Sequence, residues 1–247
     1  MLKRLFASAA AAALVAIGGP VAEAQGRGNK RFCTSSVAIN VLFATQSPAE
    51  DASRAEVARF EREMNQLLDR IATNAPDEIA DTVETAVNGV REDPSLGDPV
   101  VQAAVNALDD WVIDNCGYDV VTVTATDYAF DGIPRTLRPR TVLFDFTNDG
   151  AELHELVLVR VKNDTPLREL LELPEEDFEA NFEFISAVQA QQGDAAVLYT
   201  QLRKPGRYAA VCFLPVGSTS PDVVESATGP PHHAEGMIAE FQVRRTN

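Results

Sequence analysis

The feature that most constrains this chain is a change in the spacing of its apolar residues near Gly117. Before that glycine, apolar residues recur every three or four positions, which is the repeat of one helix face. After it they alternate with polar residues, which is the repeat of a half-buried strand. A chain of 247 residues is long enough for two such parts with separate cores. The sequence therefore predicts a two-domain α+β protein, with a helical bundle over 25–117 and an antiparallel β-sandwich over 118–247.

The helical part contains three amphipathic runs and a shorter apolar piece at 37–43. Residues 47–50 read Ser-Pro-Ala-Glu, a capping box with proline at the first helical position, and so predict a helix start there. Further helices are expected after Pro76 and after Asp98. The last should end just before Gly117, because glycine suits a left-handed C-terminal cap. Together these segments predict a small helical bundle.

Six alternating runs follow Gly117, separated by Gly, Pro, Asn and Asp, as is typical of a sandwich of antiparallel strands. They occupy 119–126, 140–148, 154–161, 195–202, 207–214 and 237–243. The stretch 165–192 interrupts the alternation. We expect a short helix followed by an acidic excursion there.

Residues 1–24 have the composition of a bacterial secretory signal peptide. Lys3 and Arg4 precede an apolar run, and Ala22-Glu23-Ala24 provides a small-residue cleavage site. The run is shorter than the roughly 20 apolar residues that span a bilayer. We therefore expect cleavage after Ala24, a secreted or periplasmic protein, and no membrane span in the mature chain.

The chain is strongly acidic, with a formal net charge of −16. Nucleic acids and anionic lipid surfaces are bound by basic patches. The overall charge therefore disfavours both as partners. The charge is compatible with a protein partner in the envelope, redox or otherwise, which the sequence does not identify.

The chain has three cysteines, which an oxidising compartment would leave as one disulfide and one thiol. Cys33 opens the helical part and Cys116 closes it. We predict a disulfide between them, worth roughly 4 kcal/mol in the chain-entropy model. Cys212 would then remain a free thiol in the sandwich.

The histidines, the remaining cysteine and a methionine of the sandwich lie at strand ends and in one loop. His154 begins a predicted strand and Cys212 ends another, while His232, His233 and Met237 fall within the loop "GPPHHAEGM". A sandwich could gather these positions at one pole. Thiolate, two imidazoles and a thioether form the ligand set of blue copper sites, although a cysteine and two histidines would also suit zinc.

These motifs resemble those of the cupredoxins over about 120–243. The likeness lies in the order of "DYAFDGIPRTL", "FDFTNDGAELHEL", "GRYAAVCFLP" and "PHHAEGMIAEFQV". It implies a Greek-key sandwich, one mononuclear type 1 copper ion, and one-electron transfer. The implied ligands are His154, Cys212, His232 and Met237. The spacing of five from His232 to Met237 matches plastocyanin-like domains and leaves His233 as a bystander.

One departure from that pattern is the length of the loop before the second histidine. Nineteen residues separate Cys212 from His232. The loop either leaves the site and returns, or marks a domain that has kept the fold and lost the metal. Three functions stay open: a copper electron carrier, a copper-binding or chaperone module without a redox circuit, and a metal-free interaction domain. We expect no enzyme, since Cys212 has no recognisable orienting aspartate or oxyanion loop for hydrolysis.

Overall fold

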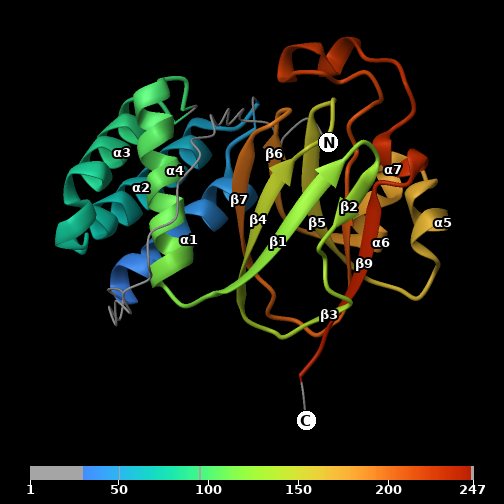
Figure 1. Cartoon of the computed structure of the whole chain (residues 1–247), viewed down its shortest axis with the longest axis horizontal. Coiled ribbons are helices and arrows are strands. Elements are labelled where there is room, and N and C mark those ends of the chain that lie inside the picture. Colours follow the sequence, from blue (N-terminus) through green and yellow to red (C-terminus); the bar gives the residue numbers. More distant parts are fainter. Residues whose placement is uncertain (1–29, 50, 95, 246–247) are drawn as a thin grey trace.

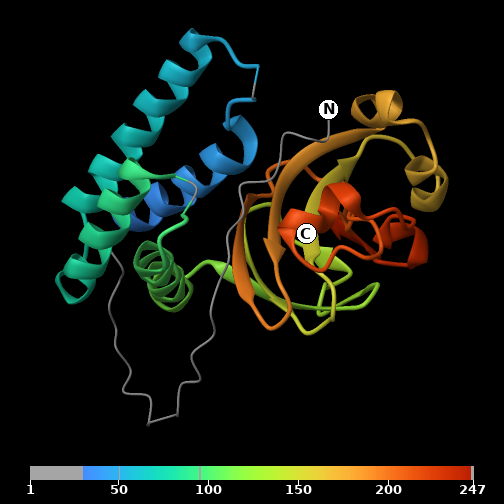
Figure 2. The ribbon, with the colours of Figure 1, turned by 90° about the horizontal axis from the view of Figure 1, so that it is seen from above.

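The computed structural model describes residues 30–49, 51–94 and 96–245, and the predicted signal peptide lies outside them. Four helices lie to one side of a two-sheet sandwich, as two perpendicular views show (Figures 1 and 2). Within the described ranges no helix is long and apolar enough to cross a bilayer. The predicted combination of a helical part and a sandwich is confirmed.

The helical part is a bundle whose core joins residues of all four helices. The helices are α1 (Lys30–Gln46), α2 (Arg54–Thr73), α3 (Ala80–Glu92), preceded by the short 3₁₀ turn η2 (Asp77–Ile79), and α4 (Pro99–Asn115). The expected short apolar piece is therefore part of a full helix, α1. Gly117 has φ +66°, which confirms the expected left-handed cap after α4.

The capping box of α2 lies six residues later than the sequence suggested. Ser53 N donates to Glu56 Oε2 at 2.8 Å, and Glu56 N donates to Ser53 Oγ at 3.3 Å. Ser47 instead follows α1, and its hydroxyl donates to the Phe43 carbonyl at 2.6 Å. Because Pro48 disfavours helical backbone in the residue before it, α1 ends at Gln46 and does not continue into Ser47.

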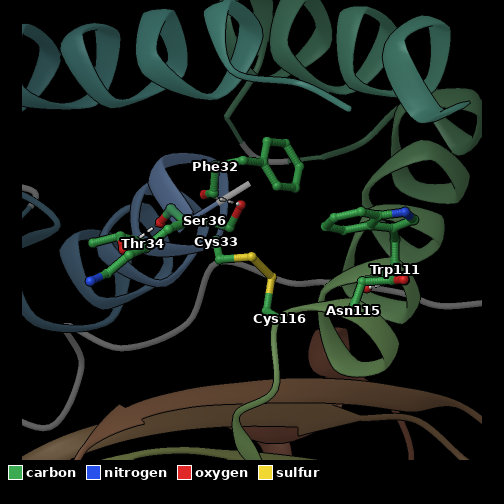
Figure 3. The surroundings of a disulfide bond; sticks show 8 residues. Phe32, Cys33, Thr34, Ser36, Trp111, Asn115 and Cys116 are labelled. Carbon is green, nitrogen blue, oxygen red and sulfur yellow. Dashed lines mark hydrogen bonds between the residues drawn. A yellow bond between two sulfur atoms is a disulfide. The ribbon is translucent and has the colours of Figure 1, made fainter. Parts of the chain in front are cut away.

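The predicted disulfide joins Cys33 in the first turn of α1 to Cys116 at the end of α4, with 5.7 Å between the Cα atoms (Figure 3). Beside it, the fully buried Phe32 ring meets Trp111 edge to face at 5.3 Å. The bond closes the bundle where the chain passes into the sandwich. Cys212 is the free, buried cysteine of the described residues, as expected.

The sandwich consists of two sheets with strand orders β2-β1-β4-β7 and β3-β9-β8-β5-β6. All six predicted strands are present, and three more accompany them. The strands are β1 (Asp119–Thr126), β2 (Ala129–Asp131), β3 (Thr136–Leu137), β4 (Thr141–Asn148), β5 (His154–Val161), β6 (Phe182–Ala190), β7 (Ala195–Gln201), β8 (Gly206–Val211) and β9 (Ile238–Val243). Side chains from the inner faces of both sheets form its core.

Two strand pairings depart from the expected antiparallel pattern. β1 runs parallel to β4, and β3 runs parallel to β9. Between β1 and β4 the chain forms β2 in one sheet and β3 in the other. This crossover returns the chain to β4 in the direction of β1, so the sandwich is mixed.

The segment after β5 contains the expected short helix, α5 (Leu167–Leu171), followed by η3 (Glu175–Asp177) and α6 (Phe178–Asn181). The sequence did not predict β6, which pairs antiparallel with β5. β6 is an edge strand, and most of its side chains are only half-buried. Its apolar alternation is weak for that reason, so the run resembled a loop.

The core of the helical bundle extends onto the sandwich. Leu143 of β4 and Tyr199 of β7 are buried among the helices. The Tyr199 hydroxyl donates to Asp109 Oδ1 of α4 at 2.6 Å. The change of secondary structure coincides with the predicted boundary at Gly117, while the division into separately folding domains stays a prediction.

Candidate metal centre

Three potential metal ligands meet at one pole of the sandwich, although they come from distant parts of the sequence. His154 is the first residue of β5, Cys212 directly follows β8, and His232 begins the short helix α7 (His232–Glu235). β5 and β9 both pair antiparallel with β8, so the start of β5 and the approach to β9 lie beside the end of β8. All three side chains are fully buried, and their ligand atoms lie within 4.8 Å of one another.

The distances between these atoms suit a single bound ion. His154 Nδ1 lies 3.2 Å from His232 Nδ1, which lies 3.3 Å from Cys212 Sγ. Two ligand atoms that each lie about 2.1 Å from one ion, roughly 105° apart, are about 3.3 Å from each other. The donor set of two imidazoles and a thiolate therefore fits one copper ion, as the sequence motifs implied.

Each histidine uses its outer nitrogen to bind a carboxylate. His154 Nε2 donates to Asp127 Oδ1 at 3.0 Å, and His232 Nε2 donates to Glu152 Oε2 at 3.0 Å. These roles follow from the partners, because an ionised carboxylate only accepts hydrogen bonds. Both Nδ1 atoms then present lone pairs to each other. A cation between them relieves that repulsion.

Hydrogen bonds keep both outer carboxyl groups ionised. Burial alone would raise the pKa of Asp127, but donation from His154 and from the Glu152 and Ala151 backbone lowers it. Burial likewise opposes ionisation of Glu152, and donation from the Gly217 backbone, His232 and Tyr128 lowers its pKa. Two negative charges therefore stand behind the two imidazoles.

Burial favours the uncharged forms of His154 and Cys212. Burial is the main cause that lowers the pKa of His154, and it outweighs the opposing effect of Asp127. Burial also raises the pKa of Cys212 well above its usual range, with a further contribution from Glu155. A metal ion that binds here must displace the thiol proton, so binding is coupled to proton release.

The backbone holds Met237 beside the cluster. Its N–H donates to the His232 carbonyl at 3.0 Å, and its carbonyl accepts from Cys212 N at 3.2 Å. The residue is fully buried and packs in the sandwich core. The resemblance implies its thioether as a weak fourth ligand.

His233 does not join the cluster. Its backbone N–H donates to the Cys212 carbonyl at 2.9 Å, and its ring packs edge to face against Phe213 at 5.4 Å. Of the two adjacent histidines, the structure brings His232 to Cys212.

The nineteen-residue loop leaves the site and returns to it. Pro215 and Pro231 form an isolated antiparallel bridge at its base, and Val216 N donates to the Pro230 carbonyl at 2.9 Å. The loop then extends beyond that pole and carries the 3₁₀ helix η4 (Pro221–Ser226) (Figure 1). Near its start, Gly217 N donates to Glu152 Oε2 at 2.8 Å. The insertion thus holds the carboxylate that binds His232.

Sequence reasoning missed the turn that supports the ligands. Fully buried Asn148 donates to the Glu152 and Ala190 carbonyls at 2.8 Å, and its Oδ1 accepts from Gly150 N at 2.8 Å. A Cβ atom on Gly150 would lie 2.5 Å from His154 Nε2, so only glycine fits there. The motif "NDGAELH" contained these residues, but nothing in it showed which of them face inward.

Tyr128 is a second unpredicted member of the site. Its φ of +67° is unusual for a tyrosine and marks a constrained turn between β1 and β2. The ring lies edge to face against His232 at 5.0 Å, and the hydroxyl donates to Glu152 Oε1 at 3.2 Å. The turn therefore fixes both His232 and its carboxylate partner.

No protein-family model matches the sequence, and no curated protein matches it either. Solved structures similar to about half of the chain include an auracyanin from the photosynthetic bacterium Roseiflexus castenholzii, with 18% identity, TM-score 0.33, and coverage of 52% of this chain and 100% of that one. Auracyanin A, a "blue" copper protein from Chloroflexus aurantiacus, has 17% identity and TM-score 0.32 over 52% of this chain and 100% of its own. The McoA multicopper oxidase variant from Aquifex aeolicus has 13% identity and TM-score 0.30 over 52% of this chain and 30% of its own.

The structure has the two-sheet sandwich and the ligand cluster that the sequence resemblance implies. Its motifs occur in the order that the sequence resemblance describes, and they bring a cysteine and two histidines to one pole. The second half of this chain is a two-sheet sandwich that resembles the cupredoxins in the order of its motifs and in its cluster of one cysteine and two histidines.

Proposed function

We propose that this protein binds one type 1 copper ion through His154, Cys212 and His232, with Met237 as a weak fourth ligand, and carries one electron at a time. One observation supports this most directly. The Nε2–H groups of both imidazoles donate to carboxylates, so each Nδ1 presents a lone pair inward. These two nitrogen atoms and the Cys212 sulfur lie within 4.8 Å of one another. Bound copper would supply the one-electron couple.

The protein's own residues favour a carrier over an enzyme or a copper chaperone. The three ligands are fully buried, which leaves no open position for a substrate. The same burial disfavours release of the ion to a partner. The ligands lie on or beside β-strands, and hydrogen bonds fix both imidazoles, so the site would change little between oxidation states.

The proposed location is the periplasm or the cell exterior. The disulfide between Cys33 and Cys116 suits an oxidising compartment, and residues 1–24 have the composition of a secretory leader. The redox partner is a second protein of that compartment.

Titration of the metal-free mature chain with Cu(II) tests the proposal. We expect one equivalent to bind and to produce a strong visible thiolate-to-copper band that a mild reductant bleaches reversibly. Cys212→Ser should lose the band while keeping the fold, and His233→Ala, the matched control, should keep it. Copper binding without the band would favour a copper-binding module, and no binding would favour a metal-free interaction domain. Tight Zn(II) binding that copper fails to displace would indicate a zinc site.

A further inference from the structure

Basic side chains gather at the end of the sandwich opposite His154, Cys212 and His232. The three segments 132–141, 201–207 and 243–245 contain no aspartate or glutamate, in a chain of net charge −16. We call their basic residues the basic pole: Arg135, Arg138, Arg140, Arg203, Lys204, Arg207, Arg244 and Arg245. The charge of the chain is therefore strongly segregated.

Backbone hydrogen bonds join the three segments, so the pole is one surface. Arg244 N donates to the Leu137 carbonyl at 3.0 Å, and Leu202 N donates to the Arg140 carbonyl at 2.9 Å. In Figure 1, β3 and the C-terminal end of β9 lie at the end of the sandwich away from α7. β5 begins at His154 and ends at Val161, which pairs with Arg207 of the basic pole. Its eight residues span about 25 Å at roughly 3.3 Å each, so the pole lies at the far end of the strand from His154.

Three of the eight basic residues of the pole form ion pairs, and the other five form none within the described chain. Arg140 pairs with Asp119 at 2.8 Å, and Lys204 pairs with Glu183 at 2.7 Å. Arg207 pairs with Glu240 at 2.7 Å, and Arg244 donates to the Thr136 hydroxyl at 3.1 Å. No carboxylate of the described chain forms an ion pair with the four remaining arginines, which are all exposed: Arg135, Arg138, Arg203 and Arg245.

The pole includes a shallow hollow suited to an oxyanion. Arg140, Arg203 and Arg245, one from each segment, line it together with Pro139, Thr141 and Gln201. Guanidinium groups bind phosphate oxygens with two parallel hydrogen bonds. None of the exposed large hydrophobic side chains of the described chain lies in the three segments.

We propose that the basic pole docks on the phosphate groups of an anionic phospholipid surface, with one headgroup phosphate in the hollow between Arg140, Arg203 and Arg245. A specific protein partner would be expected to meet a more apolar centre.

Asp119, Glu183 and Glu240 pair with three of the eight basic residues and leave five without an acidic partner. The overall acidity of the chain disfavours such a surface, but acidic groups farther than about 8 Å from the pole are largely screened at physiological ionic strength. Docked in this way, the protein directs the pole that contains His154, Cys212 and His232 away from the lipid surface, where a partner protein can approach it.

Vesicle sedimentation of the full mature chain tests this docking. Each basic side chain near an anionic surface raises binding about fivefold. The triple variant Arg138→Gln, Arg203→Gln and Arg245→Gln should therefore bind phosphatidylglycerol-containing vesicles on the order of 100-fold more weakly than wild type. Pure phosphatidylcholine vesicles should bind neither, and added salt should weaken the wild-type binding.

The control variant carries the same charge change elsewhere, at exposed positions on α2 and α5: Arg54→Gln, Arg62→Gln and Arg168→Gln. It should bind vesicles within twofold of wild type. Equal losses in both variants, or wild-type binding without preference for anionic vesicles, would overturn the proposal. So would a pole variant that keeps vesicle binding but loses binding to polyglutamate, because the pole would then recognise an acidic polypeptide. Metal-free and copper-treated protein should behave alike, so this test is independent of the copper site.

Discussion

His232 and Glu152, eighty positions apart in the chain, are joined by a hydrogen bond of 3.0 Å from Nε2 to Oε2. The same carboxylate oxygen accepts from Gly217 N at 2.8 Å, in the long loop that precedes His232. The insertion between Cys212 and His232 therefore has a structural role in the site. Its backbone fixes the Glu152 carboxylate that accepts from His232.

The first prediction concerns that carboxylate. Glu152→Gln removes its negative charge and weakens the hold on the His232 tautomer, so Cu(II) affinity should fall about 10- to 100-fold. The reduction potential should rise, because a nearby negative charge stabilises Cu(II) more than Cu(I). Competition titration and redox titration measure both effects. Exposed Glu235 on α7 provides the control, and an equal shift in Glu235→Gln would assign the effect to net charge alone.

Gly150→Ala should disturb the other imidazole. The added Cβ would lie 2.5 Å from both Asp127 Oδ1 and His154 Nε2 and would push the two groups apart. Chemical unfolding of the metal-free protein should show a loss of about 1–3 kcal/mol, the usual cost of overpacking. Cu(II) affinity should also decrease. A variant with wild-type stability and affinity would show that the contact between Asp127 and His154 is dispensable.

Met237→Leu should keep the visible band and raise the reduction potential. Loss of a weak axial donor disfavours Cu(II) relative to Cu(I), while the cysteine and histidines that produce the colour remain. Met64→Leu makes the same exchange in the core of the helical bundle, and its potential should match that of wild type. An unchanged potential in Met237→Leu would remove that residue from the ligand set.

A pH dependence of stability should originate at the contact between α4 and the sandwich. Burial raises the pKa of Asp109 to about 7, against the lowering effect of the bond from Tyr199 and with a further rise from Asp110. Burial and Asp110 also raise the pKa of Asp145 on β4. A raised acid pKa means that the folded state retains protons which the unfolded chain has lost. Stability should therefore fall as the pH rises from about 4 to 7, by a few kcal/mol at most.

Asp109→Asn keeps an acceptor for the Tyr199 hydroxyl and cannot ionise. Its unfolding free energy should vary less than that of wild type between pH 4 and pH 7. Asp114→Asn, on the same helix, should leave the wild-type pH profile unchanged. Identical profiles for Asp109→Asn and wild type would show that Asp109 ionises normally in the folded protein.

A chain shortened to begin at Tyr118 should fold as a β protein and bind copper, because the ligands and their carboxylate partners all lie beyond that point. It exposes Leu143 and Tyr199, which the helices bury, so its stability should be lower than that of the full chain. Circular dichroism and copper titration check this outcome. An unfolded fragment would show that both parts form a single folding unit.

Features that depend on local apolar pattern or on the scarcity of a residue type could be predicted from the sequence. Apolar spacing located the helical part and six strands, since each element buries one face and its period follows from backbone geometry. Three cysteines left few pairings, and the bond between Cys33 and Cys116 is present. The spacing to Met237 predicted His232 rather than His233 as the ligand, and His232 is the one that lies beside Cys212.

The tertiary structure alone decided which side chains surround the ligands. Asp127 and Glu152 resemble many exposed acids in this acidic sequence, and only the pairing of distant strands and turns brings each to an imidazole. It also decided the parallel pairing of β1 with β4, because strand partners are selected by packing between segments far apart in the chain. Local patterns record which face of an element is buried. Hydrogen-bond partners depend on contacts across the fold, and those form only when the two sheets pack together.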